Sequence, residues 1–141
     1  MENTRPPIDE YKDLSENMRH YGNMRFAQLT IFIAITGGLL AVIFGNKNPS
    51  PNHIIIPLIG ISIAIMFWIM EERAADYWQT FKKRAVVLEI KLGFQQYSIR
   101  PKARFWDKLT ATNASRAIYG LSILFWIHYF ILLFFILHNC A

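Results

Sequence analysis

The 141-residue sequence contains a single cysteine, Cys140. One thiol can form neither an internal disulfide nor a cysteine-based zinc site. The sequence also lacks a His/Cys cluster with metal-ligand spacing, a glycine-rich phosphate loop, and a serine or cysteine nucleophile beside a plausible base. We therefore expect no metal and no cofactor, and we predict that the protein is not an enzyme.

Charged residues are scarce and unevenly placed. They make up 18% of the chain, and hydrophobic residues make up 53%, whereas about 25% of a typical soluble domain is charged. Three blocks, Phe26–Phe44, Ile54–Met70 and Ala117–Leu137, contain no Asp, Glu, Lys or Arg in 19, 17 and 21 residues. A helix needs about 20 apolar residues to cross a bilayer. We predict an all-α integral membrane protein with three transmembrane helices.

Polar segments divide the chain around these blocks. An N-terminal amphipathic helix is expected first, with Gly22 as its weak point, and the second span should project into the cytoplasm because no helix breaker separates Gly60 from Gly93. The predicted segments are the N-terminal helix 1–24, the first span 25–45, an extracytoplasmic turn 46–53, the second span 54–70, the helix continuing it 71–96, an interfacial basic segment 97–116, the third span 117–138 and an extracytoplasmic tail 139–141. Thr110, Thr112 or Asn113 is expected to cap the third span.

The distribution of Lys and Arg predicts the orientation. Four basic residues lie before the first span or at its first residue, and ten lie between the second and third spans, whereas the turn holds only Lys47 and the tail holds none. We predict a multi-pass membrane protein with a cytoplasmic N-terminus and an extracytoplasmic C-terminus. Basic residues beside a membrane typically bind anionic lipid headgroups, and nucleic acid is a poorer partner because the positive-inside bias already explains the charge. The residues expected at headgroups are Lys82, Lys83, Arg84, Arg100, Lys102, Arg104 and Trp106.

Two apolar stripes at helical spacing lie outside the spans. The N-terminal stripe is Tyr11, Leu14, Met18 and Tyr21, and the second stripe is Trp78, Phe81, Ala85, Leu88 and Leu92. The second stripe is too apolar to face water, so it needs a partner. The N-terminal helix offers one, and neighbouring copies in a homo-oligomer offer another.

Small residues four apart indicate where helices approach closely in lipid. They are Ala34 with Gly38 and Gly37 with Ala41 in the first span, and Gly60 with Ala64 in the second. The third span is bulky and aromatic. We therefore expect the first two spans at the centre of the bundle and the third outside, against lipid.

Uncharged polar residues and one histidine lie in or beside the spans. His128 sits near the middle of the third span, where an ionisable group is costly and is a candidate functional site. The pore or gating candidates are His128, Gln28, Thr30, Thr36 and Ser62. The same groups are also explained by hydrogen bonds to neighbouring helices or to their own backbone, and both interpretations stay open.

Three carboxylates cluster just after the second span. Glu71, Glu72 and Asp76 have the chemistry of a metal site or of acid–base work. The simpler interpretation pairs them with nearby Arg73 and Lys82 on the helix surface.

The stretch "YWQTFKKRAVVLEIKLGFQQY", Tyr77 to Tyr97, follows "YKDLSENMRHYGNMRFAQLTIFIAITGGLLA" in the upstream half of the chain. Together they resemble the SLATT-type effectors and the related octameric membrane family named RipA, although SLATT proteins usually have two spans. The resemblance implies an oligomeric pore-forming or membrane-disrupting effector of antiphage defence in the bacterial inner (cytoplasmic) membrane, under a sensor or nucleotide-signalling partner in the cytoplasm. The alternative is a non-catalytic membrane scaffold whose cytoplasmic helices dock a partner protein.

Overall fold

The computed structural model describes residues 6–45, 51–99 and 110–139. Within these ranges the chain forms α1 (Pro7–Gly45), a short 3₁₀ helix η1 (Pro51–Ile54), α2 (Ile55–Leu92) and α3 (Ala111–Asn139), and no strand. Three of these helices are long and apolar enough to cross a membrane. The predicted all-helical class with three helices of spanning character is confirmed for the described residues.

Helix α1 joins the predicted N-terminal helix and the first span into one rod. Its 39 residues correspond to about 58 Å at 1.5 Å per residue, and Gly22 does not interrupt it. Pro7 occupies the first helical position, where its missing amide hydrogen costs nothing, and Asp9 and Glu10 lie in the first turn. Acidic side chains there interact favourably with the helix dipole.

Helix α2 is also unbroken, over 38 residues. It stops at Gly93, the expected helix breaker, which adopts a left-handed conformation with φ of 74° and donates its amide to the Glu89 carbonyl. The Phe94 amide reaches the same carbonyl at 3.1 Å. A residue with a β-carbon would be strained in this conformation, so glycine terminates the helix here.

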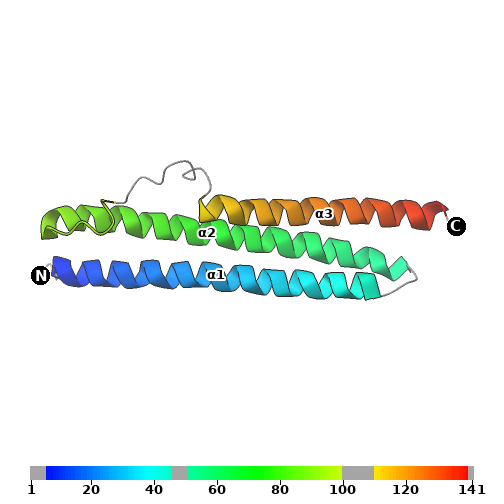
Figure 1. The fold of residues 1–141 in the computed structure, drawn as a ribbon, viewed down its shortest axis with the longest axis horizontal. Helices are drawn as coiled ribbons and strands as arrows, with labels where there is room; N and C mark the ends of the chain where they lie inside the picture. Colours follow the sequence, from blue (N-terminus) through cyan, green and yellow to red (C-terminus); the bar gives the residue numbers. More distant parts are fainter. Residues whose placement is uncertain (1–5, 46–50, 100–109, 140–141) are drawn as a thin grey trace, which may run out of the picture.

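The three long helices run nearly side by side, with α2 between α1 and α3 (Figure 1). Helix α3 starts beside the middle of α2, where the Thr110 hydroxyl accepts a hydrogen bond from the Asn113 amide at 3.2 Å and caps the helix. The expected central position of the first two spans is therefore wrong. Only α2 is central, and α3 packs on it through Tyr119 and Trp126, whose side chains are fully buried.

Helices α1 and α2 extend together beyond the start of α3 (Figure 1). We call this extension the stalk, and it comprises residues 7–22 of α1, residues 77–92 of α2 and the returning segment 93–99. The predicted interfacial segment 97–116 is divided, because its last residues form the first turns of α3 and its positions 100–109 lie outside the described residues.

Two apolar clusters hold the described helices together. The stalk cluster is Tyr11, Met18, Ala85 and Leu88, flanked by Leu14, Trp78, Phe81, Leu92 and Tyr97. The second cluster lies among the three apolar blocks and contains Phe32, Ala64 and Tyr119, flanked by Leu29, Ile63, Phe67, Trp68 and Ile123. Phe32 of α1 meets Tyr119 of α3 edge to face, with ring centroids 4.9 Å apart.

Candidate functional site: a polar junction between the stalk and the spans

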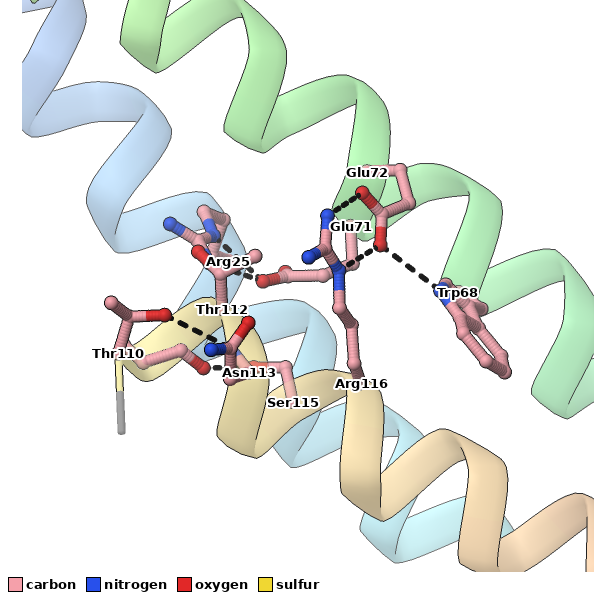
Figure 2. Close-up of polar contacts among 10 residues, drawn as sticks. Arg25, Trp68, Glu71, Glu72, Thr110, Thr112, Asn113, Ser115 and Arg116 are labelled. Carbon is pink, nitrogen blue, oxygen red and sulfur yellow. Dashed lines mark hydrogen bonds and ion pairs between the residues drawn. The ribbon is translucent and has the colours of Figure 1, made fainter. Parts of the chain in front are cut away.

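The charged residues nearest to the three apolar blocks meet at one level of the molecule (Figure 2). Arg25 is the last charged residue before the block in α1, Glu71 and Glu72 are the first after the block in α2, and Arg116 is the last before the block in α3. We call these four residues, with Trp68 and Thr112, the junction. They place the charged ends of all three blocks at a common height, as a shared bilayer boundary requires.

Arg25 connects all three helices. Its Nε donates to Glu71 Oε1 at 2.8 Å, and its Nη2 donates both to the same oxygen and to the Thr112 hydroxyl at 2.9 Å. The Glu71 side chain is only 1% exposed and that of Arg25 17%. Removing one partner of a buried ion pair leaves an uncompensated charge and costs about 3–5 kcal/mol, so this contact strongly constrains how the helices sit.

A second ion pair joins α2 to α3. The Arg116 guanidinium donates from Nε to Glu72 Oε1 and from Nη2 to Glu72 Oε2, each at 2.6 Å. The Trp68 indole also donates to Glu72, at 3.0 Å. These side chains are partly exposed, so the energy of the pair depends on its surroundings: water would weaken it.

The junction bears on the proposed metal or acid–base role of the carboxylates. Glu71 and Glu72 bind arginines on two different helices rather than Arg73 or Lys82 on their own. Among the described residues no three His, Cys, Asp or Glu side chains gather as metal ligands would. The arrangement holds helices together and positions charge.

A second polar centre lies in the stalk around Glu89, a residue that the pattern of the sequence did not single out. The carboxylate is fully buried and accepts hydrogen bonds from the Tyr11 hydroxyl at 2.9 Å, the Tyr97 amide at 2.8 Å and the Ser98 amide at 2.9 Å. It thus ties α1 and the returning segment to α2. Its position one turn after Ala85, inside an apolar stripe, is the signal that could have identified it.

The surroundings of Glu89 shift two pKa values. Burial raises the pKa of Glu89, but the hydrogen bonds from the Tyr97 amide, the Tyr11 hydroxyl and Ser98 outweigh it, so the pKa lies below its ordinary value. Burial and the hydrogen bond to Glu89 raise the pKa of Tyr11 to about 12. Across the physiological pH range, Glu89 therefore remains a hydrogen-bond acceptor and Tyr11 remains a donor.

The two predicted stripes pack against each other within one chain. Tyr11 and Met18 of α1 share a buried cluster with Ala85 and Leu88 of α2, and Tyr21 stacks on Tyr77, with centroids 5.4 Å apart. Of the two partners left open by the sequence, the chain's own N-terminal helix therefore covers the stripe. The stripe is not a free surface for another protein.

The polar residues of the spans are not brought together. The hydroxyls of Thr30 and Ser62 bond to carbonyls one turn earlier in their own helices, at 3.0 and 2.9 Å. Gln28 is buried, Thr36 lines a groove between α1 and α3, and His128 lies on the exposed side of α3. One copy of the chain thus forms no continuous polar path from these five residues.

The small residues divide into two groups. Gly60 and Ala64 are buried in α2, and the indole of Trp126 lies directly over Gly60. The four small residues of α1 are exposed instead, and they are Ala34, Gly37, Gly38 and Ala41. Gly60 thus serves the α2–α3 contact inside the chain, while the α1 group is exposed and Gly37 lines the groove between α1 and α3.

Three of the predicted headgroup ligands lie in the described stalk. Arg84 forms an ion pair with Glu10 at 2.6 Å, Lys82 lies over the Trp78 ring at 5.5 Å, and Lys83 is exposed. The other four, Arg100, Lys102, Arg104 and Trp106, lie outside the described residues, as do Lys47 and Cys140.

Comparison with protein-family models, curated proteins and solved structures found no match to this chain. The class of the protein therefore rests on its own features. It is an all-helical chain, in the part that the structure describes, with three helices of the length and apolar character of multi-pass membrane proteins.

Proposed function

We propose that the protein is an oligomeric effector of the bacterial inner membrane, which forms a pore or disrupts the bilayer when it is triggered through its stalk. Bacterial antiphage defence, under a sensor or nucleotide-signalling partner, is the setting that the resemblance to SLATT and RipA-like proteins suggests. The distribution of basic residues supports a cytoplasmic position for the stalk.

The observation that carries this proposal is the continuity of α1 and α2 from the stalk into the spans. A stiff pair of helices passes a displacement of the stalk directly to the membrane segments, whereas a flexible linker would absorb it. The junction extends the coupling to α3, because the Arg25 guanidinium contacts both Glu71 and Thr112. Movement of the stalk would therefore reach every described span.

The proposal is tested by measuring membrane permeability under an artificial trigger. A ligand-inducible dimerisation domain is fused ahead of residue 1 of the full chain, and the ligand should then depolarise expressing cells and release dye from proteoliposomes. Two glycines inserted after Arg73 should abolish the response by breaking the continuity of α2. The exposed substitution Lys83→Gln should preserve it. A fusion that reaches the membrane and never changes permeability, with this ligand or any other stimulus, contradicts the proposal.

A second candidate function, the membrane scaffold, is favoured by an apolar face at the far end of the stalk. Val87 and Ile90 are 46% and 78% exposed, and their spacing of three residues places them on one side of α2. A docking role for this face predicts that Ile90→Lys abolishes pull-down of a partner while permeability stays unchanged. Retained pull-down would contradict the scaffold.

A further inference from the structure

His128 is an unpartnered polar group at mid-span. It lies on the exposed side of α3, and its neighbours on that side are the apolar residues Leu121, Leu124, Ile131, Leu132 and Phe135, all of them exposed. Within the described residues no side chain or backbone group bonds to its imidazole. Hydrocarbon offers no hydrogen bond, so a polar group left facing lipid is costly, and such groups almost always face protein or water.

Helix α1 carries a surface at the same level that suits a close neighbour. Gly37 and Gly38 are exposed, and a β-carbon added at either would meet no atom within 4 Å. Another helix can therefore approach the α1 backbone closely and reach its carbonyl oxygens. Ala34 and Ala41 widen the same surface by one turn in each direction.

The junction gives a common reference level from which positions along α1 and α3 can be compared. Arg25 and Arg116 bind the adjacent carboxylates Glu71 and Glu72, so α1 and α3 enter the apolar region at nearly the same height. Gly37 lies twelve residues beyond Arg25, and His128 lies twelve residues beyond Arg116. At 1.5 Å per residue both positions are about 18 Å from the junction.

We infer that the exposed face of α3 around His128 packs against the Gly37–Gly38 face of α1 in a second copy of this chain. Copies inserted the same way in one bilayer share their depth, so His128 of one copy meets Gly37 of the next without any adjustment of height. Lipid can cover the apolar neighbours of His128 but supplies no hydrogen-bond partner at this depth, which favours protein as the occupant.

The contact joins two different helix faces, and Gly37 of α1 and Leu121 of α3 line the same groove within one copy. It is therefore compatible with a two-fold pair, in which each copy places its α3 on the other's α1, and with a ring of head-to-tail contacts. The inference rests on the oligomer of the proposed function and specifies its interface, with α1 and α3 as the two contacting helices.

Site-directed cross-linking of the full chain tests the interface. In a Cys140→Ser background, oxidation of the pair Gly37→Cys with His128→Cys should give a disulfide between copies. The matched control is Gly37→Cys with Ile59→Cys, because Ile59 is exposed on α2 twelve residues before Glu71 and thus shares the depth but not the face. Equal cross-linking of the two pairs would overturn the inference.

Two further measurements avoid any change to the glycines. With p-benzoylphenylalanine in place of His128, photo-cross-links should map to α1 of another copy, whereas cross-links to lipid alone or to other helices would overturn the inference.

His128→Leu should weaken association between copies about tenfold, the effect of one interhelical hydrogen bond in a membrane, and His128→Asn should restore much of it. Unchanged association in both variants would count against the interface. Retained permeability with cross-links elsewhere would refute this interface and leave the proposed function standing.

Discussion

Glu89 shows how a single acidic residue organises the stalk. Its carboxylate is fully buried, yet three donors from α1 and the returning segment satisfy it. A buried carboxylate with such donors is stable, and loss of its charge weakens the hydrogen bonds from all three donors. Glu89 therefore links the end of α2 to the returning segment 93–99 and to α1.

Replacement Glu89→Gln should destabilise this corner of the stalk by about 2–3 kcal/mol. The charge-assisted hydrogen bonds are lost, and the NH₂ group of the glutamine, itself a donor, would face one of the donors that now bind the carboxylate. Tyr11→Phe should cost about 1 kcal/mol, since it removes one hydroxyl donor only. Hydrogen exchange of the Tyr97 and Ser98 amides measures both effects. The exposed Glu16→Gln is the control, and equal protection in the Glu89 variant would show that the carboxylate does not hold the return.

Gly60 lies at a position where a side chain would clash with a neighbouring helix. The indole of Trp126 occupies the space that a β-carbon at Gly60 would need, and the Trp126 side chain is fully buried. Glycine is needed here for close approach, since the backbone conformation is ordinary helix.

Replacement Gly60→Leu should separate α2 from α3 or cost about 1–3 kcal/mol through overpacking. The thermal midpoint of the purified chain in detergent should fall. Gly22→Leu is the matched control, because nothing lies within 4 Å of a β-carbon there. The double variant Gly60→Leu with Trp126→Ala should recover part of the loss, and a lack of any effect from Gly60→Leu alone would contradict the packing.

At the scale of elements, the stalk depends on the protonation states of Glu89 and Tyr11. Glu89 has a lowered pKa, so its contribution is present above its ordinary pKa of 4.5 and is lost as the pH falls through the lower value in the folded stalk. Tyr11 has a raised pKa, so its contribution is complete below 10 and is lost as the pH rises through about 12. The stalk should hold best between about pH 5 and pH 10.

Distances between spin labels placed on exposed Lys12 and Lys91 should therefore stay narrowly distributed near neutral pH and broaden at both extremes. Glu89→Gln should remove the part of the acidic dependence that belongs to its carboxylate, while the Glu10–Arg84 pair keeps its own part. Tyr11→Phe should remove the part of the alkaline dependence that belongs to its phenol. A distribution that does not change between pH 3 and pH 12 would show that these groups do not control the stalk.

At the scale of the whole molecule, the stalk lies at one end of the described helices, where α1 and α2 extend beyond the start of α3 (Figure 1). The segment η1 precedes α2, at the opposite end of that helix. Fourteen of the 15 basic residues belong to the stalk side of the sequence. By the positive-inside rule we predict that the stalk lies in the cytoplasm.

Labelling of single cysteines in a Cys140→Ser background tests this orientation. A membrane-impermeant maleimide added to intact bacterial cells should label His53→Cys, and it should label Lys12→Cys only after the membrane is opened. The reverse pattern would place the stalk outside and would also remove the cytoplasmic trigger from the proposed function.

The spans, the end of α2 and the two stripes were predictable because they depend on local properties. Uncharged blocks of spanning length indicate three apolar helices whatever their neighbours, and Gly93 ends α2 by its own backbone preference. Periodicity identified both stripes. Their pairing remained one of two options, because spacing along a helix does not say whether the partner belongs to the same chain.

Contacts between helices needed the tertiary structure. The pairing of Arg25 with Glu71, the burial of Glu89 and the central position of α2 all depend on which faces meet, and many pairings of three helices bury similar apolar area. Composition and charge thus determined the spans, their lengths and their expected orientation. Packing decided that Gly60 would face Trp126 while Gly37 faced outward, because a glycine acquires its role only from the side chain placed against it.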